Sequence, residues 1–262
     1  MSETLTVNEI YLSLQGESTF AGLPCVFIRL TACNLRCSYC DTAYAFTEGR
    51  TMCLPEIRAE VLRLSKPFHL DQSTITPYLP ESAGIPHSAF RPPHLPLVEL
   101  TGGEPLLQSN SLPLMARLCD DGFTVLLETS GALDIEPVDS RVRRIMDLKC
   151  PSSGESARNR WANLPHLKST DEIKFVIGTF EDYDWTKEKI AEHRLAEICP
   201  VLVSWVHPLT PQQQHKSLKP VPNDQRPITR QELAEKIIAD ALPVRFQAQL
   251  HKIIWAPEKR GV

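Results

Sequence analysis

The chain has 262 residues, 42% of them hydrophobic and 23% charged, a balance typical of a folded globular protein. Its 28 basic and 32 acidic side chains give a net charge of −4, which argues against a protein that binds nucleic acid or an anionic membrane through a general excess of basic residues. No apolar run approaches the roughly 18 residues needed to span a bilayer, and the chain start lacks signal-peptide features, so we expect a cytoplasmic protein.

Strand-like and helical segments alternate along the chain. Clusters of β-branched and other apolar residues predict strands at 26–30, 97–100, 123–128, 144–148, 172–177, 201–206 and 244–247. Amphipathic patterns predict helices at 55–65, 112–120, 181–197 and 230–241, and the last begins with a capping box from Thr229 to Glu232. This alternation indicates an α/β fold with a mostly parallel sheet. About six such units predict a partial (β/α)6 barrel in a single domain spanning residues 1–262, and a doubly wound sheet is the alternative.

Two proline-rich stretches, 67–96 and 207–227, interrupt the alternation. Loops of this length are uncommon in compact domains and are often functional lids or disordered segments. We interpret both as insertions over one end of the sheet. His87 and His94 lie in or beside the first stretch without a spaced partner, so we expect both to be solvated.

Three cysteines follow the first predicted strand in the order Cys33-x3-Cys37-x-Tyr-Cys40. Three thiolates this close in sequence suit an iron–sulfur cluster, and three ligands leave one iron of a four-iron cube open for chemistry. Zinc is the alternative, and it would need a fourth ligand from elsewhere, such as Cys25 or Cys53.

The other cysteines carry no comparable signal. In a reducing cytoplasm, cysteines are more often metal ligands or buried thiols than disulfides. Cys25, Cys119 and Cys199 lie in or beside apolar runs and are predicted to be core residues, whereas Cys53 and Cys150 receive no role.

A second motif, Thr101-Gly-Gly-Glu-Pro105, follows the strand predicted at 97–100, where ligands bind in open α/β sheets. Its glycines allow the backbone to approach a ligand, and the Glu104 carboxylate can accept hydrogen bonds from an ammonium group. Together with the cysteine pattern, this motif resembles the radical S-adenosylmethionine superfamily. The resemblance implies a 4Fe–4S cluster on Cys33, Cys37 and Cys40, with the open iron bound to the methionine part of S-adenosylmethionine.

The same resemblance continues at the ends of the next two predicted strands, in Glu128-Thr-Ser-Gly131 and Asp147-Leu-Lys149. In isolation, such residues are usually turns or solvated charges. The resemblance implies S-adenosylmethionine contacts from Tyr39, Asp41, Gly103, Glu104, Glu128, Ser130 and Lys149.

Further runs resemble one family within the superfamily, the 7-carboxy-7-deazaguanine synthases of queuosine and 7-deazapurine biosynthesis. These runs are Ser13-Leu-Gln-Gly-Glu-Ser18, Phe27-Ile-Arg-Leu30, Cys40-Asp-Thr42 and Gln249-Leu-His251. The resemblance implies a radical ring contraction of 6-carboxy-5,6,7,8-tetrahydropterin with loss of ammonia, and a Mg²⁺ ion held by Thr42. It implies substrate contacts from Leu14, Gln15, Gly16, Glu17, Arg29, Thr101 and His251.

The chemistry of these residues suits a carboxylated pterin. Glu17 can pair with the amidine-like N–H edge of the ring, Gln15 offers a donor and an acceptor, and Arg29 offers a planar fork for the carboxylate. Simpler interpretations exist for each: a Gln-Gly-Glu turn, a solvent-facing Arg29 and a core His251.

The resemblance also implies a flavodoxin- or ferredoxin-type reductant and a homodimer. Residues 253–262 continue past the histidine in a way that departs from some family members, so the chain end receives no role. One rival function is a glycyl-radical-activating enzyme, which shares the cysteine signature but leaves Gln15, Glu17 and His251 unexplained. The other is a zinc-stabilised binding module without catalysis.

Overall fold

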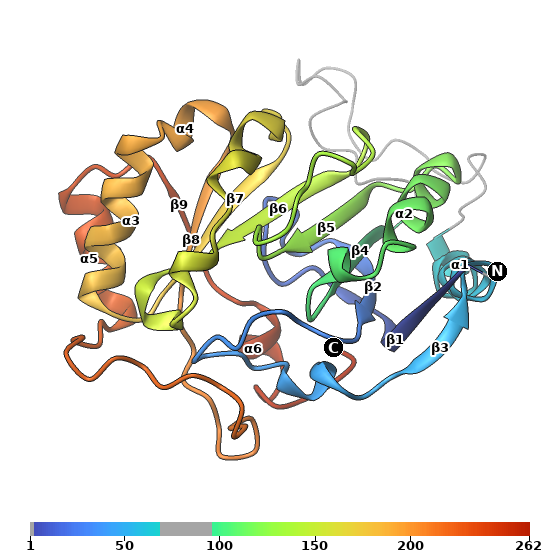
Figure 1. Cartoon of the computed structure of the whole chain (residues 1–262), viewed down its shortest axis with the longest axis horizontal. Helices are drawn as coiled ribbons and strands as arrows, with labels where there is room; N and C mark the ends of the chain where they lie inside the picture. The colour runs from blue at the N-terminus through green and yellow to red at the C-terminus, as the bar shows by residue number, and fades with distance from the viewer. Residues whose placement is uncertain (1–2, 69–95) are drawn as a thin grey trace, which may run out of the picture.

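The computed structural model of the chain describes residues 3–68 and 96–262. Its centre is a nine-stranded sheet in the order β3-β1-β2-β4-β5-β6-β7-β8-β9 (Figure 1). The strands are β1 (Thr4–Leu14), β2 (Pro24–Leu30), β3 (Arg50–Cys53), β4 (Leu97–Gly102), β5 (Val125–Thr129), β6 (Arg143–Leu148), β7 (Glu172–Ile177), β8 (Val201–Trp205) and β9 (Arg245–Gln247).

The sheet is parallel from β2 to β9, and only β1 pairs antiparallel, with β2 and β3. The parallel strands, β2 and then β4 to β9, follow one another in chain order without reversing. A doubly wound sheet would reverse at a switch point, whereas a barrel adds each strand on the same side of the last. The described strands form an open sheet with β3 and β9 at its edges, so the predicted partial barrel is confirmed and the doubly wound alternative is not observed.

Most helices lie on the outer side of this sheet. The α-helices are α1 (Leu54–Ser65), α2 (Ser111–Asp120), α3 (Phe180–Glu192), α4 (Leu195–Ile198), α5 (Arg230–Ala239) and α6 (His251–Ile254). Short 3-10 helices are η1 (Ala43–Phe46), η2 (Lys66–Phe68), η6 (Pro105–Leu107), η7 (Pro151–Ser153), η8 (Ser156–Arg158) and η9 (Trp161–His166). Figure 1 shows α1 and α2 beside one half of the sheet and α3, α4 and α5 beside the other, while α6 lies apart, close to the C-terminus.

Several element boundaries differ from the sequence-based predictions. Strands β1 and β3 were not predicted, because polar residues interrupt β1 at a register shift between Val7 and Glu9, and β3 is short and mostly exposed. The helix predicted at 181–197 is two helices, since Arg194 adopts a left-handed backbone conformation with φ of 51°. The capping box at Thr229 is present, with the Glu232 amide donating to the Thr229 hydroxyl at 3.2 Å. Among the described residues, the β5–β6 and β6–β7 connections contain no α-helix, so the barrel units are less regular than expected.

The two faces of the sheet bury different side chains. Apolar residues on the outer face, such as Val98 and Leu100, join the main core under the helices. The inner face has a small apolar cluster toward the amino ends of the strands, formed by Cys25, Phe27, Leu97, Leu126 and Ile145. Because side chains alternate along a strand, the next inward-facing positions toward the carboxyl ends are polar, among them Arg29, Glu99, Thr101, Glu128 and Asp147. This gradient places the polar residues at one open end of the barrel.

The second proline-rich stretch, 207–227, packs against neighbouring segments. The Lys219 amide donates to the Arg36 carbonyl at 2.9 Å, and the Gln213 side chain donates to the Pro257 carbonyl at 2.9 Å. Most of the first stretch, including His87 and His94, lies outside the described residues. No helix within the described ranges is long and apolar enough to cross a membrane.

Candidate active site

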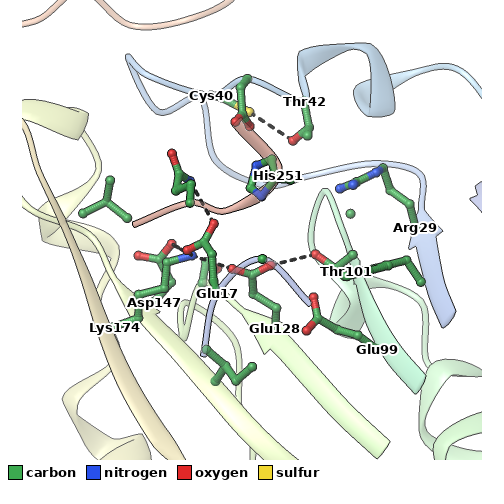
Figure 2. A pocket seen from close by; sticks show the side chains of 18 of the residues that line it. Glu17, Arg29, Cys40, Thr42, Glu99, Thr101, Glu128, Asp147, Lys174 and His251 are labelled. Carbon is green, nitrogen blue, oxygen red and sulfur yellow. Dashed lines mark hydrogen bonds and ion pairs between the residues drawn. The ribbon is translucent and has the colours of Figure 1, made fainter. Parts of the chain in front are cut away.

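A cavity of about 230 Å³ opens at the carboxyl ends of the parallel strands. Its walls come from the β1–β2 loop, the loop carrying the three cysteines (residues 33–42, the cluster loop), the ends of β4 to β7, and α6 with the residues before it. Every residue predicted for the cluster, S-adenosylmethionine, magnesium or the substrate lines this cavity, with the single exception of Glu104. Figure 2 shows acidic and basic side chains from these separate segments converging on the same space.

The cluster loop is held by hydrogen bonds from a neighbouring loop. The Arg36 amide donates to the buried carboxylate of Glu155 at 2.7 Å. The Ser38 amide donates to the Ser153 carbonyl at 3.0 Å, and the Ser38 hydroxyl donates to the Ser152 carbonyl at 2.7 Å. These contacts fix the backbone between the cysteines independently of any bound group.

The Sγ atoms of the three cluster-loop cysteines do not all lie within 4.8 Å of one another, so they are not arranged as in a closed zinc site, and their binding of an iron–sulfur cluster stays a prediction. Thiolates around a tetrahedral zinc ion lie about 3.8 Å apart, given Zn–S bonds of about 2.3 Å. Within the described ranges, the only group of three potential metal ligands with atoms within 4.8 Å of one another is Asp134, Glu136 and His166, which contains no cysteine. Burial raises the pKa of each cluster-loop thiol, that of Cys37 to about 12, so binding of a metal centre must displace their protons. The two cysteines considered as a fourth zinc ligand lie elsewhere: Cys25 in the inner apolar cluster and Cys53 at the start of α1.

The Gly-Gly-Glu-Pro turn packs directly against the start of the cluster loop. A Cβ on Gly103 would lie 1.9 Å from the Ala32 carbonyl oxygen, so only glycine fits there. The Glu104 carboxylate is fully buried and accepts hydrogen bonds from the Ser130 amide at 2.8 Å and the Ser130 hydroxyl at 2.6 Å. Glu104 therefore ties the end of β4 to the end of β5, and its predicted contact with the cofactor stays a prediction.

Lys174 and Glu99 are site residues that the sequence analysis missed. The Lys174 ammonium pairs with Glu17 at 2.6 Å and Glu128 at 2.8 Å, and lies 4.0 Å from Asp147 (Figure 2). The signal for Lys174 was present: one basic residue occupies an inward position of a strand whose other residues, apart from Glu172 at its start, are apolar. Burial by itself would raise the pKa of Glu128, but the Lys174 charge outweighs it and lowers that pKa to about 2.

Glu99 forms the floor of the cavity and orients Gln15. The Gln15 side-chain amide donates to the Glu99 carboxyl group, and both residues are buried. Burial, assisted by the nearby Glu128 charge, raises the pKa of Glu99 well above its usual value. Through its contact with Gln15, the Glu99 carboxyl group fixes the direction in which Gln15 presents its amide.

Arg29 faces the cavity with its side chain only 13% exposed, so the solvent-facing interpretation is wrong. Its Nε donates to Glu9 at 2.8 Å, and one terminal nitrogen donates to the Tyr11 hydroxyl at 2.9 Å. The Tyr44 hydroxyl also donates to Glu9, at 3.0 Å. These partners hold the guanidinium in one plane at the cavity wall.

The β1–β2 loop meets α6 at His251. A Cβ on Gly16 would lie 2.5 Å from His251 Nδ1, so the absence of a side chain at Gly16 lets the β1–β2 loop approach the ring. The Leu250 backbone amide donates to the Gly16 carbonyl at 2.9 Å, and the Gln249 side-chain amide donates to the Glu17 carboxylate at 2.8 Å. Burial lowers the pKa of His251, so its ring is neutral at pH 7.

Three residues of the cluster loop after Cys37 and the separate Lys149 also line the cavity. Asp41 pairs with Lys252 of α6 at 2.6 Å, and Thr42 contacts Cys40 through a weak hydroxyl–sulfur interaction at 3.7 Å. The Tyr39 hydroxyl is buried and has no hydrogen-bond partner among the described residues. Lys149 pairs with Asp147 at 2.8 Å.

Comparison with known proteins gives full-length relatives. The chain is 40% identical over 264 residues to 7-carboxy-7-deazaguanine synthase of Koribacter versatilis, covering 98% of this chain and 100% of that one. It is 38% identical over 261 residues to the synthase of Chlorobaculum tepidum, covering 98% and 97%. No family model matches the chain.

Solved structures agree at the level of the fold. The crystal structure of QueE from Escherichia coli superposes with a TM-score of 0.62 at 20% identity, covering 95% of both chains. The full-length sequence relatives and the site motifs agree, and they leave the glycyl-radical-activating and zinc-module alternatives without support. The chain belongs to the 7-carboxy-7-deazaguanine synthase family of the radical S-adenosylmethionine superfamily.

Proposed function

We propose that the chain converts 6-carboxy-5,6,7,8-tetrahydropterin into 7-carboxy-7-deazaguanine with loss of ammonia, a step of queuosine and 7-deazapurine biosynthesis. The observation that carries this proposal is the match, along nearly the whole chain, to the synthases of that name. The cavity supports it, because the thiols and the residues assigned to the pterin face one space.

The cluster loop and the strand ends provide the cofactor half of the cavity. Cys33, Cys37 and Cys40 would hold the 4Fe–4S cluster, and Gly103, Ser130 and Lys149 line the space beside them. When bound, the cluster and S-adenosylmethionine supply a 5′-deoxyadenosyl radical that removes a hydrogen atom from the substrate. The protein's part is to hold both ligands in fixed positions and to exclude water from the cavity.

The other half of the cavity suits the pterin. Arg29 presents cationic N–H groups to the substrate carboxylate, while Glu17 and Gln15 face the edge of the ring that carries N–H groups. His251, neutral at pH 7, can donate or accept one hydrogen bond without adding charge. Misplacing the reacting atoms by about one ångström can cost on the order of a hundredfold in rate, so such positioning is a sufficient catalytic role.

Thr42 is the proposed protein ligand of a Mg²⁺ ion shared with the substrate. Thr42 lines the cavity, and within residues 3–68 and 96–262 the one hydrogen bond of its hydroxyl is the weak contact with Cys40. Magnesium prefers octahedral oxygen ligands and keeps several waters, so one hydroxyl plus substrate oxygens is a plausible set. In a Thr42→Val variant we expect normal cluster content and loss of the stimulation of turnover by magnesium. Unchanged stimulation would assign Thr42 a structural role only.

The remaining proposals concern partners and setting. The chain folds as one domain, works in the cytoplasm, receives electrons from a flavodoxin- or ferredoxin-type protein and forms a homodimer. The continuous sheet from β3 to β9 supports the single domain. Light scattering of the anaerobic protein tests the dimer, and a monomeric mass would exclude it.

The decisive experiment is anaerobic turnover of the carboxylated tetrahydropterin with S-adenosylmethionine, magnesium and a chemical reductant. We expect 7-carboxy-7-deazaguanine and ammonia in equal amounts. Cleavage of S-adenosylmethionine without consumption of the pterin would contradict the proposal.

A further inference from the structure

Lys174 occupies an unusual position for a basic residue. It lies in the middle of β7, a fully buried strand between β6 and β8, and its side chain is 5% exposed. Figure 2 shows it directed toward the cavity, among carboxylates from other segments. Removing an ammonium group from water costs several kcal/mol unless nearby charges compensate for it. The position therefore requires acidic partners.

Two carboxylates contact Lys174 closely. The ammonium group lies 2.6 Å from Glu17 and 2.8 Å from Glu128. Asp147 is farther away, at 4.0 Å, and has its own cation in Lys149 at 2.8 Å. Burial by itself would lower the pKa of Lys174, but the Glu128 and Glu17 charges outweigh it and raise that pKa, so the ammonium stays protonated.

The two close partners of Lys174 come from segments that are distant in sequence. Glu17 lies on the β1–β2 loop and also accepts a hydrogen bond from Gln249, next to α6. Glu128 lies near the end of β5 and accepts one from the Thr101 hydroxyl at 2.9 Å. Within residues 3–68 and 96–262, Lys174 is the one charged side chain that forms ion pairs with both. Under the proposed function, Glu17 faces the pterin and Glu128 faces the cofactor.

We infer that Lys174 is a positioning residue that couples the pterin subsite to the S-adenosylmethionine subsite, an inference that rests on the proposed function. Its single ammonium group holds Glu17 and Glu128 in the orientations in which they meet their ligands. When one ligand binds and fixes its carboxylate, the shared cation fixes the other carboxylate as well. Without Lys174, two like charges face each other, and one carboxylate must rotate away or take up a proton.

Calorimetry on the cluster-loaded enzyme without reductant tests this inference, since no turnover occurs. The pterin dissociation constant is measured with and without S-adenosylmethionine for the parent, Lys174→Met and Lys174→Arg. We expect S-adenosylmethionine to tighten pterin binding by the parent. In Lys174→Met, pterin binding should weaken by about tenfold or more, as when one partner of a buried charge pair is removed, and the effect of S-adenosylmethionine should disappear. Lys174→Arg, which keeps the charge, should retain part of the pterin affinity and part of the effect of S-adenosylmethionine on it.

The pH dependence separates positioning from general stability. Lys174 lowers the pKa of Glu128, so this carboxylate stays ionised from about pH 5 to 8 in the parent. The parent's own pH profile of pterin affinity, to which His251 also contributes, is the reference. Relative to that profile, Lys174→Met should show an additional pH dependence in the same range as one carboxylate gains a proton. The matched control is Lys168→Met. It removes the 2.9 Å ion pair between Lys168 and Asp171, neither of which lines the cavity, and it should leave the pterin affinity and the coupling unchanged.

Two results would overturn the inference alone: a parent that binds both ligands without any coupling, or a Lys174→Met variant with the parent's affinity, coupling and pH profile. A parent that binds S-adenosylmethionine but not the pterin would overturn the proposed function and this inference with it. If Lys174→Met does not fold, the double variant Lys174→Met/Glu128→Gln removes one charge of each sign and should also lack coupling. Parent-like coupling in the double variant would refute the inference.

Discussion

At the scale of single residues, most charged groups in the cavity already have a partner within the chain. Arg29 is held by Glu9 and Tyr11, and Asp41 is paired with Lys252. Such pairing restricts each side chain to one orientation before any ligand arrives, which lowers the ordering cost of binding. The resulting predictions concern orientation as much as charge.

Changing Arg29 to Lys should weaken pterin binding by about tenfold, although the charge is kept. A lysine ammonium lacks the planar fork, so it cannot contact Glu9 and Tyr11 while also presenting donors to a carboxylate. Calorimetry with the carboxylated pterin measures the effect. Arg143→Lys, at a position outside the cavity, is the control. Equal affinities for the Arg29 variant and the parent would show that Arg29 does not bind the substrate carboxylate.

Lys252→Met should destabilise the protein in a pH-dependent way. Burial by itself would raise the pKa of Asp41, but Lys252 lowers it from 3.8 to about 2. Because the folded-state pKa is depressed, the pair stabilises the fold above about pH 4 and loses this contribution as pH falls toward 2. We expect a loss of roughly 2 kcal/mol at pH 7 in urea unfolding of the iron-free protein, and a smaller loss near pH 3. If Lys252→Met lowers the free energy of unfolding by the same amount at pH 7 and at pH 3, the loss of the Asp41–Lys252 ion pair is not the cause.

At the scale of elements, the cluster loop depends on two segments distant in sequence. Glu155, before η8, accepts from the Arg36 amide, and Lys219 of the 207–227 stretch pairs with Glu155 at 3.0 Å. The Lys219 side chain also donates to the Gly154 carbonyl at 2.7 Å, and its stem covers Gly154, where a Cβ would lie 2.8 Å from it. This stretch, predicted as an insertion, therefore braces the loop that carries the cysteines.

Glu155→Ala should weaken retention of the cluster, because the Arg36 amide loses its acceptor and Lys219 loses its partner. Glu155→Gln keeps an acceptor for the Arg36 amide, so its rate of iron release should lie between the rates of Glu155→Ala and the parent. Iron release to a chelator under anaerobic conditions measures the effect, and we expect it to be several-fold faster for Ala. Glu136→Ala, at an exposed site, serves as the control. If all variants release iron at the parent's rate, the brace does not contribute to cluster binding.

At the scale of the whole molecule, the open barrel determines which residues share the cavity. Its strand order brings the β1–β2 loop, the strand ends and α6 to the same end, so that Glu17 and Gln249 are hydrogen-bonded across 232 positions of sequence. Helices α1 to α5 cover the opposite face of the sheet. The eight cysteines are therefore divided between environments that sequence position alone does not separate.

Each of Cys33→Ala, Cys37→Ala and Cys40→Ala should abolish cluster binding, whereas Cys119→Ala should leave it intact. The first three line the cavity, while Cys119 lies on α2 and packs against the outer-face core. Iron and sulfide analysis of the anaerobic protein should give about four of each per chain for the parent and Cys119→Ala. Stoichiometric zinc without iron in the parent would contradict the cluster assignment.

Local sequence was sufficient for the motifs and for most of the sheet. The spacing of Cys33, Cys37 and Cys40 and the Gly-Gly-Glu-Pro turn indicated the cofactor chemistry, because ligands on one loop are neighbours in sequence. The seven parallel strands were readable from apolar runs, since all of them except the edge strand β9 are largely buried on both faces. The edge strand β3 and the bulged β1 carry weaker patterns, and their pairing depends on partners elsewhere in the chain.

The charge network of the cavity was decided only by the tertiary structure. Lys174 and Glu99 belong to no motif, and their importance arises from Glu17, Glu128 and Gln15, which reach them from other segments. Likewise, Glu104 belongs to a recognisable motif, but its buried carboxylate accepts hydrogen bonds from Ser130, which follows β5. A buried charge is stabilised by groups within a few ångströms in space, and sequence distance does not reveal which groups those are.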